Sequence, residues 1–343
     1  MNKAQIKKAF WMLFTLMLSV LTVMALLKQS QSMSVETLIK KISEADLKWI
    51  LIAMISASCY VVLEAVALCS ILKGIGFKQK LYNGIIYSTS DVYFSAITPS
   101  ATGGQPASAY FMLKDGIPAG VASAALILNL MMYNASIVFL GVIAIIIAPK
   151  SFLSFHLTSR VLIVLGFIGL TLLSYFFLSV LRGSEKIFDF IRKILVFFYE
   201  KRLIHRLETR LEKLDKIESD YKNCSDLISG KTKIMAKAFI WNVLQRASQI
   251  IVPTLVYISF GGTKHFAPLL FSKQCLITIG YNYVPIPGAL GIADYLMIDG
   301  FSSMMHKGAA FELDMISRGI TFYICVTISG IITLIGYLRG RKK

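Results

Sequence analysis

The sequence TPSATGGQP, residues 98–106, interrupts an apolar segment that runs from Leu81 to Leu113. Proline cannot donate a backbone hydrogen bond and glycine weakens a helix, so one continuous helix cannot extend through this stretch. A second apolar segment, Phe266 to Met297, is interrupted in the same way by VPIPGALG at residues 284–291. Both segments continue into an Asp-Gly pair, and we therefore interpret them as two helix-break-helix hairpins of one kind.

The composition of the chain indicates that these hairpins lie in a membrane. Of the 343 residues, 56% are hydrophobic and 16% are charged, whereas about 25% of the residues of a typical soluble domain are charged. Uncharged runs of about 20 residues recur, and a helix of that length crosses about 30 Å of hydrocarbon. Backbone without helical hydrogen bonds is tolerated at that depth only where protein or water surrounds it. We expect an all-α polytopic integral membrane protein in which both broken segments are re-entrant hairpins.

About six apolar segments are long enough to be full spans. They are Phe10–Leu27, Trp49–Leu72, Ile117–Ala148, Val161–Leu181, Ala238–Phe260 and Ile320–Leu338. The formal net charge of +17 would suggest nucleic acid as the partner of a soluble protein. Here the basic residues lie beside the apolar runs, which is typical of loops that face an anionic leaflet. We expect both termini in the cytoplasm of a bacterial or archaeal cell, with the protein in the cell membrane.

Two membrane halves, residues 1–181 and 238–343, are predicted on either side of a basic connector, residues 182–237. Hairpin 81–113 belongs to the first half and hairpin 266–299 to the second, and the number of spans makes them enter from opposite faces. Paired broken segments are typical of inverted-repeat transporters, which bind their ligand near the midplane. The connector has the apolar spacing of amphipathic helices. A solvated connector and an arm that senses lipid or binds a partner both stay open.

Charged side chains at membrane depth are costly, so each is a candidate for a ligand site. Arg246 lies roughly 13 Å into the segment that begins at Ala238, taking about 1.5 Å per residue. A guanidinium forms paired hydrogen bonds to phosphate or carboxylate oxygens, so Arg246 is a candidate clamp for an anionic headgroup. Glu64 and Asp91 are its candidate charge partners within the membrane. A direct ion pair with either acid, or a proton relay, is the alternative.

The hairpin breaks supply further candidates. The missing side chain at Gly103, Gly104 or Gly288 would let a ligand approach the backbone. Half-helices that begin after Pro106 and Gly291 would present backbone N–H groups and a positive dipole end to an anion.

Three polar side chains stand near the breaks or before the last span. Gln105 can both donate and accept hydrogen bonds. Asp294 falls in the first turn of the second half-helix, where capping the backbone is its expected role. Arg318 is expected at the membrane interface, with a role in the site as the alternative.

No catalytic residue, metal site or cofactor is predicted. The five cysteines lie far apart, without a C-x-x-C pair or nearby histidines. Gly230-Lys231-Thr232 resembles the end of a P-loop, but Ser225 stands where that motif needs glycine. The signatures of serine hydrolases, zinc proteases and dinucleotide-binding folds are absent.

The paired motifs resemble the two signatures of the lysylphosphatidylglycerol synthase transmembrane region, also called the flippase-like domain. The matching residues are Thr102, Gly103, Gly104, Gln105, Pro106, Tyr110 and Gly116, then Pro285, Pro287, Gly288, Leu290, Gly291 and Asp294. Arg246 and Arg318 are similar to arginines of that family, and the resemblance extends over about Phe10 to Leu338. At positions 289 and 294 this chain has Ala and Asp where the family often has Gly and Glu. The resemblance implies a membrane domain like a lipid translocase, with these residues around the lipid.

In the multiple peptide resistance factors of this family, a soluble domain transfers lysine from lysyl-tRNA to phosphatidylglycerol, which gives resistance to cationic peptides. This chain continues for only a few residues beyond its last expected span, and we expect no such domain within it. The first candidate function is a flippase that binds and translocates an anionic or aminoacylated phospholipid. The alternatives are a phosphatidylglycerol lysyltransferase, alone or with a separate cytoplasmic catalytic partner, and a secondary transporter of a small anion. Apart from lysyl-tRNA under the enzyme alternative, no nucleic acid is expected to bind, and homodimer formation stays open.

Overall fold

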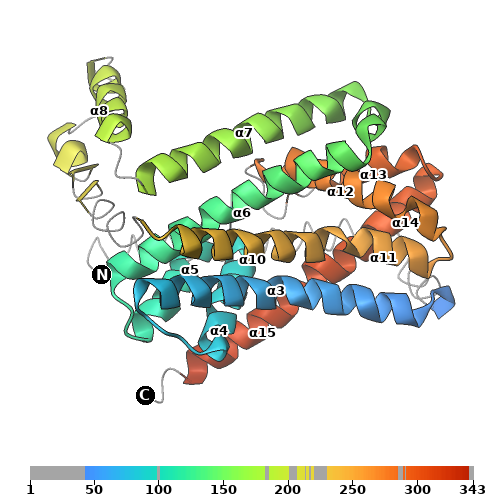
Figure 1. Ribbon diagram of the computed structural model, residues 1–343, viewed down its shortest axis with the longest axis horizontal. Helices are drawn as coiled ribbons and strands as arrows, with labels where there is room; N and C mark the ends of the chain where they lie inside the picture. Colours follow the sequence, from blue (N-terminus) through green and yellow to red (C-terminus); the bar gives the residue numbers. More distant parts are fainter. Residues whose placement is uncertain are drawn as a thin grey trace, which may run out of the picture.

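The computed structural model describes residues 43–98, 101–181, 185–200, 207–212, 214–215, 218–219, 230–284, 289 and 291–339 (Figure 1). All regular secondary structure in these residues is helical, in agreement with the all-α prediction. The first expected span, Phe10–Leu27, lies outside the described residues, and so do Pro285, Pro287, Gly288 and parts of the connector.

Four helical stretches are long and apolar enough to cross a membrane. Three are single helices: α3 (Leu47–Ile75), α6 (Ala119–Ile147) and α7 (Leu157–Leu181). In the fourth, α14 (Lys307–Arg318) continues through a π-helical turn, Gly319–Ile324, into α15 (Cys325–Arg339). Each contains most or all of one expected span, and the protein is thus a helical membrane protein.

The expected span Ala238–Phe260 is divided into two helices, α10 (Thr232–Ile250) and α11 (Val252–Ser259). The interruption comes just before Pro253, whose nitrogen cannot donate the hydrogen bond that a continuing helix requires. α10 packs against α3 and α6, and α11 continues along α3. The hydropathy pattern predicts one span here, and the structure shows two helices that are divided just before Pro253.

Hairpin 1 consists of α4 (Leu81–Ile97) and α5 (Gly104–Lys114), which pack against each other. α4 ends at Thr98, which is extended (φ −110°, ψ 146°) as expected for a residue before proline. The Thr98 hydroxyl accepts a hydrogen bond from Gly103 N–H at 2.9 Å. Both outer ends of hairpin 1 join the bundle at one end, through short turns to α3 and α6.

Hairpin 2 consists of α12 (Ala267–Asn282) and α13 (Ile292–Ser302), which also pack against each other. α12 lies in addition against α6 and α7. The outer ends of hairpin 2 follow the 3₁₀ turn η3 (Lys264–Phe266) and precede α14, at the opposite end of the bundle from those of hairpin 1 (Figure 1). At about 1.5 Å per residue, α5 and α13 are each about 16 Å long, and neither could cross a bilayer alone.

The outer surface of the bundle is apolar. On α7 the exposed side chains include Val164, Leu165, Ile168 and Leu172. A large exposed apolar surface is unusual on a soluble protein, and it is expected for helices that face hydrocarbon chains.

The connector contains α8 (Glu185–Glu200), which lies apart from the bundle in Figure 1. Its exposed side chains include Phe190 and Phe197. A helix is therefore present where the aromatic-rich part of the connector was expected to form one, and its place at a lipid interface stays a prediction.

Arg192 of α8 binds three acidic residues of the connector. It donates hydrogen bonds to Asp215 (2.8 Å), Glu218 and Asp189 (2.9 Å). These bonds, the one to Asp215 most of all, raise the pKa of the Arg192 guanidinium above its ordinary value. The network connects α8 to a later part of the connector.

Candidate functional site

A polar central cavity lies where the breaks of the two hairpins meet. It consists of two adjoining hollows, of about 360 Å³ and about 700 Å³, which share Tyr60, Tyr133 and Asn282 in their linings. Ala101 from the break of hairpin 1 and Ala289 from the break of hairpin 2 both line the smaller hollow. Residues from both breaks therefore border one cavity.

Arg246 of α10 lines the smaller hollow. Only 3% of this residue is exposed to solvent. Its Nη1 donates to Gln249 Oε1 (2.7 Å) and its Nη2 to the Tyr60 hydroxyl (3.1 Å). The guanidinium carbon lies 3.8 Å from the centre of the Tyr133 ring. Neutral groups thus hold the cation in place at the wall of the cavity.

Arg246 forms no direct ion pair with an acidic side chain in the part of the chain that the structure describes, but Glu64 and Asp91 lie near enough to interact with its charge at longer range. Its buried Nε has no hydrogen-bond partner among the described residues. A buried donor without a partner costs free energy, which a ligand oxygen or a water molecule could recover. Arg246 therefore has the charge and the donor capacity to bind an anion in the cavity.

Glu64 and Asp91 line the larger hollow. Glu64 accepts hydrogen bonds from the Ser88 hydroxyl (3.0 Å) and the Gln245 side chain (3.2 Å). The carboxyl group of Asp91 lies close enough to that of Glu64 for the two to interact. The cavity is therefore basic beside Arg246 and acidic beside this pair.

Gly104 allows α5 to begin directly against Asp91. A Cβ atom at this position would lie 1.9 Å from Asp91 Oδ1 and 2.0 Å from Ser95 Oγ. The next residue, Gln105, donates from its side chain to Asp91 Oδ2 at 3.4 Å and lines the larger hollow. We expected the missing side chain at Gly104 to let a ligand approach the backbone. In the structure it makes room for the Asp91 side chain, which lies at the start of α5, where the helix dipole favours negative charge.

Gly104→Ala is expected to lower the stability of the protein by about 1–3 kcal/mol, because the added Cβ must displace α5 or the Asp91 side chain. Thermal unfolding of the purified protein in detergent measures this effect. Gly308→Ala is the matched control, since a Cβ there would meet nothing within 4 Å. If the thermal midpoint of Gly104→Ala is no lower than that of Gly308→Ala, then α5 does not approach Asp91 as closely as the structure shows.

Arg318 is buried inside the bundle, in the last of the four long helical stretches, where it takes part in the site that was the alternative expectation for it. The helix begins at Lys307, and Arg318 is 8% exposed. Its guanidinium forms an ion pair with Asp294, whose other carboxyl oxygen accepts a hydrogen bond from Gly291 N–H at 2.8 Å. Asp294 thus caps α13 as predicted, and it also holds Arg318 at the lining of the smaller hollow.

The π-helical turn that follows Arg318 borders the same cavity. Turns of this kind are rare and occur often at functional sites. Thr321 and Phe322 of this turn line both hollows. Asp314, fully buried one turn before Arg318, is a further acidic neighbour of the Arg318–Asp294 pair.

Several residues predicted for the site do not line the central cavity. Gly103, Pro106 and Tyr110 line a separate apolar groove beside hairpin 1. Gly291 begins α13 with a φ of +80°, so its role there is to allow the left-handed turn.

Sequence reasoning missed Tyr60, Tyr133 and Asn282, which line both hollows. Tyr60 lies four residues before Glu64, and this spacing could have indicated a shared face of α3. Tyr133 and Asn282 come from different segments, and their side chains hydrogen-bond at 3.3 Å. Nothing local in the sequence indicates this contact.

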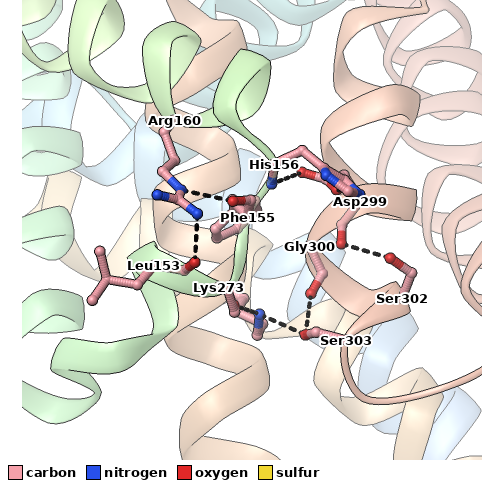
Figure 2. Close-up of polar contacts among 10 residues, drawn as sticks. Leu153, Phe155, His156, Arg160, Lys273, Asp299, Gly300, Ser302 and Ser303 are labelled. Carbon is pink, nitrogen blue, oxygen red and sulfur yellow. Dashed lines mark hydrogen bonds and ion pairs between the residues drawn. The ribbon is translucent and has the colours of Figure 1, made fainter.

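A third buried cation, Lys273 of α12, lies at the base of hairpin 2 and was also missed (Figure 2). Its ammonium donates to the hydroxyls of Ser154 and Ser303, the latter at 2.9 Å. It lies 4.9 Å from the centre of the Phe155 ring. Uncharged groups therefore solvate this ammonium in place of water.

Asp299 of α13 completes the same cluster (Figure 2). It accepts a hydrogen bond from His156 N–H at 3.0 Å, and its carboxyl group lies 3.5 Å from His156 Nε2. Ser154 ends the 3₁₀ turn η2 (Pro149–Ser154), and His156 precedes α7. The cluster therefore joins hairpin 2 to the corner between α6 and α7.

The fold and the buried charges define a helical membrane protein with a polar cavity between two broken hairpins. The chain belongs to the family of the lysylphosphatidylglycerol synthase TM region, whose sequence profile matches residues 12–329. The family predicted from the hairpin motifs is thereby confirmed. A relative from Archaeoglobus fulgidus, described as a UPF0104 membrane protein, is 22% identical over 311 residues, which cover 85% of this chain and 90% of the relative.

Proposed function

We propose that the protein is a flippase-like translocase that binds an anionic or aminoacylated phospholipid and moves it across the cytoplasmic membrane. The observation that carries this proposal is the buried Arg246 guanidinium, which lines the central cavity, makes no direct ion pair among the described residues and has an Nε without a hydrogen-bond partner there. A phosphate or carboxylate group of a headgroup would complete its hydrogen bonds. Arg318 lines the same hollow and would add to the positive potential there.

The acidic side of the cavity supports the aminoacylated form of the proposal. Glu64 and Asp91 line the larger hollow, which adjoins the one lined by Arg246. A headgroup with a phosphate and an ammonium could place one charge beside each wall. Charge complementarity of this kind gives selectivity more than affinity.

The proposal includes the finer topology expected from the sequence. Hairpins 81–113 and 266–299 would be re-entrant and would enter from opposite faces, with their breaks at the depth of the cavity. The basic ends of the chain and the connector would lie in the cytoplasm. The half-helices are too short to cross hydrocarbon alone, which supports this topology. A homodimer and a separate cytoplasmic catalytic partner are further parts of the proposal that binding experiments would test.

Reconstitution into liposomes tests the proposal. Labelled phosphatidylglycerol, phosphatidylethanolamine and lysylphosphatidylglycerol would be added in turn, and their movement between leaflets compared with that in protein-free liposomes. Faster movement of the anionic or lysylated lipid supports a translocase, and no acceleration of any lipid refutes it. Uptake of inorganic phosphate without lipid movement would favour a small-anion transporter. Formation of lysylphosphatidylglycerol after addition of lysyl-tRNA would favour the transferase.

A further inference from the structure

An apolar groove of about 870 Å³ lies between hairpin 1 and α15. Its walls include Phe94 of α4, Pro106 and Phe111 of α5, and Ile331 and Leu334 of α15. α15 packs against α4 along this line. The groove therefore runs beside membrane helices and has an almost wholly apolar lining.

The groove adjoins the larger hollow of the central cavity. Ala96, Phe322 and Val326 line both of them. Phe322 belongs to the π-helical turn that also borders the polar side. A molecule that lies across this junction has polar surroundings at one end and apolar surroundings at the other.

Beside the far part of the groove, a cation lies between two aromatic rings. Lys114 lies 5.2 Å from the ring centre of Tyr110 and 5.0 Å from that of Tyr337. Both tyrosines line the groove, and both lie near the end of the bundle where hairpin 1 joins it. Lys and Tyr are typical of the level of lipid headgroups.

Several apolar side chains of the groove are exposed. Leu334 is 57% exposed and Ile331 is 55% exposed. On a helix long and apolar enough to cross a membrane, such a groove is open to hydrocarbon chains. Since those chains are as apolar as its walls, entry of a chain costs little free energy, and the affinity for a lipid must come from the headgroup.

We propose that this groove holds an acyl chain of the phospholipid whose headgroup occupies the central cavity. The inference rests on the proposed function, and it adds the route of the chain: between α4, α5 and α15, past Val326. The headgroup then reaches the polar cavity while the chain stays in apolar surroundings throughout. Gly103 and Pro106, which line the groove and not the polar cavity, would contact the chain.

The test uses the full chain in liposomes that contain phosphatidylglycerol with a photoreactive group on one acyl chain. After irradiation, mass spectrometry maps the labelled peptides. Label on peptides of α4, α5 and α15 is the expected result. Leu334→Trp, which fills the groove, should abolish that label. Ile335→Trp is the matched control, since Ile335 is the neighbouring residue, is 44% exposed and does not line the groove.

Val326→Trp provides a second variant, which blocks the junction with the cavity and not the outer groove. It should remove the label from the peptides around residue 326 and slow lipid movement. The same labelling in both groove variants as in wild type, or equal labelling of α7, would overturn the inference. Labelling of the groove without lipid movement would refute the translocase function and support the acyl-chain site. Failure of the proposed function can therefore be distinguished from failure of this inference.

Discussion

Arg246→Gln is expected to slow lipid movement in liposomes by about tenfold or more. A hydrogen bond to a charged group contributes about 1.5–3 kcal/mol, and about 1.4 kcal/mol corresponds to a factor of ten. Glutamine keeps polar contacts with Gln249 and Tyr60 but removes the charge that a phosphate would bind. The rate of lipid movement for Arg246→Lys should lie between those of wild type and Arg246→Gln, because an ammonium keeps the charge and loses the paired donor geometry.

The control for this prediction is Arg210→Gln on the exposed surface of the connector. It removes one positive charge without touching the cavity, and lipid movement should stay at the wild-type rate. The thermal midpoint of Arg246→Gln must be measured beside its activity, so that unfolding is not mistaken for lost binding. Equal rates for folded Arg246→Gln and wild type would remove Arg246 from the mechanism.

Asp294→Ala is expected to destabilise the protein by about 3–5 kcal/mol, since it leaves a buried guanidinium without its carboxylate partner. The substitution also removes the acceptor that caps α13 at Gly291. Adding Arg318→Met to this variant removes the unpaired charge. The double variant should therefore be more stable than the sum of the two single changes indicates, by about 0.5–3 kcal/mol.

Unfolding of the four proteins of this double-mutant cycle in detergent gives the interaction between the two side chains. The exposed pair of Asp189 and Arg192 provides the comparison, because the Asp189 side chain is 59% exposed. Asp189→Ala should change stability by about 1 kcal/mol or less. Additive effects at 294 and 318 would mean that Asp314 or another group already neutralises Arg318.

The hairpins could be predicted from the sequence because their cause is local. Proline and glycine prevent a helix wherever they occur together, and α4 and α5 lie within one residue of the segment 81–113 that was expected. Arg246 was found for a similar reason, since a charge deep in an apolar run stands out without knowledge of its neighbours. The re-entrant insertion and the division into halves 1–181 and 238–343 stay predictions.

The buried positions of Arg318 and Lys273 could not be predicted from the local sequence. Hydropathy begins the last span after Arg318 because Glu312, Asp314 and Arg318 interrupt the apolar run, whereas the helix begins at Lys307. Their charges are compensated by residues distant in the sequence, such as Asp294 for Arg318 and Ser154 for Lys273. Such partners become visible only once the helices are packed.

The cluster around Lys273 restricts which parts of the protein can move as rigid bodies. It fastens hairpin 2 to the corner between α6 and α7 through a desolvated ammonium and the Asp299 carboxyl group. If hairpin 2 moved alone, Lys273 and Asp299 would lose hydrogen-bond partners on this corner, so we expect the corner to move with the hairpin. If the proposed translocase moves its halves, we expect hinges outside this corner, for example at the helix interruption before Pro253 or at the π-helical turn after Arg318.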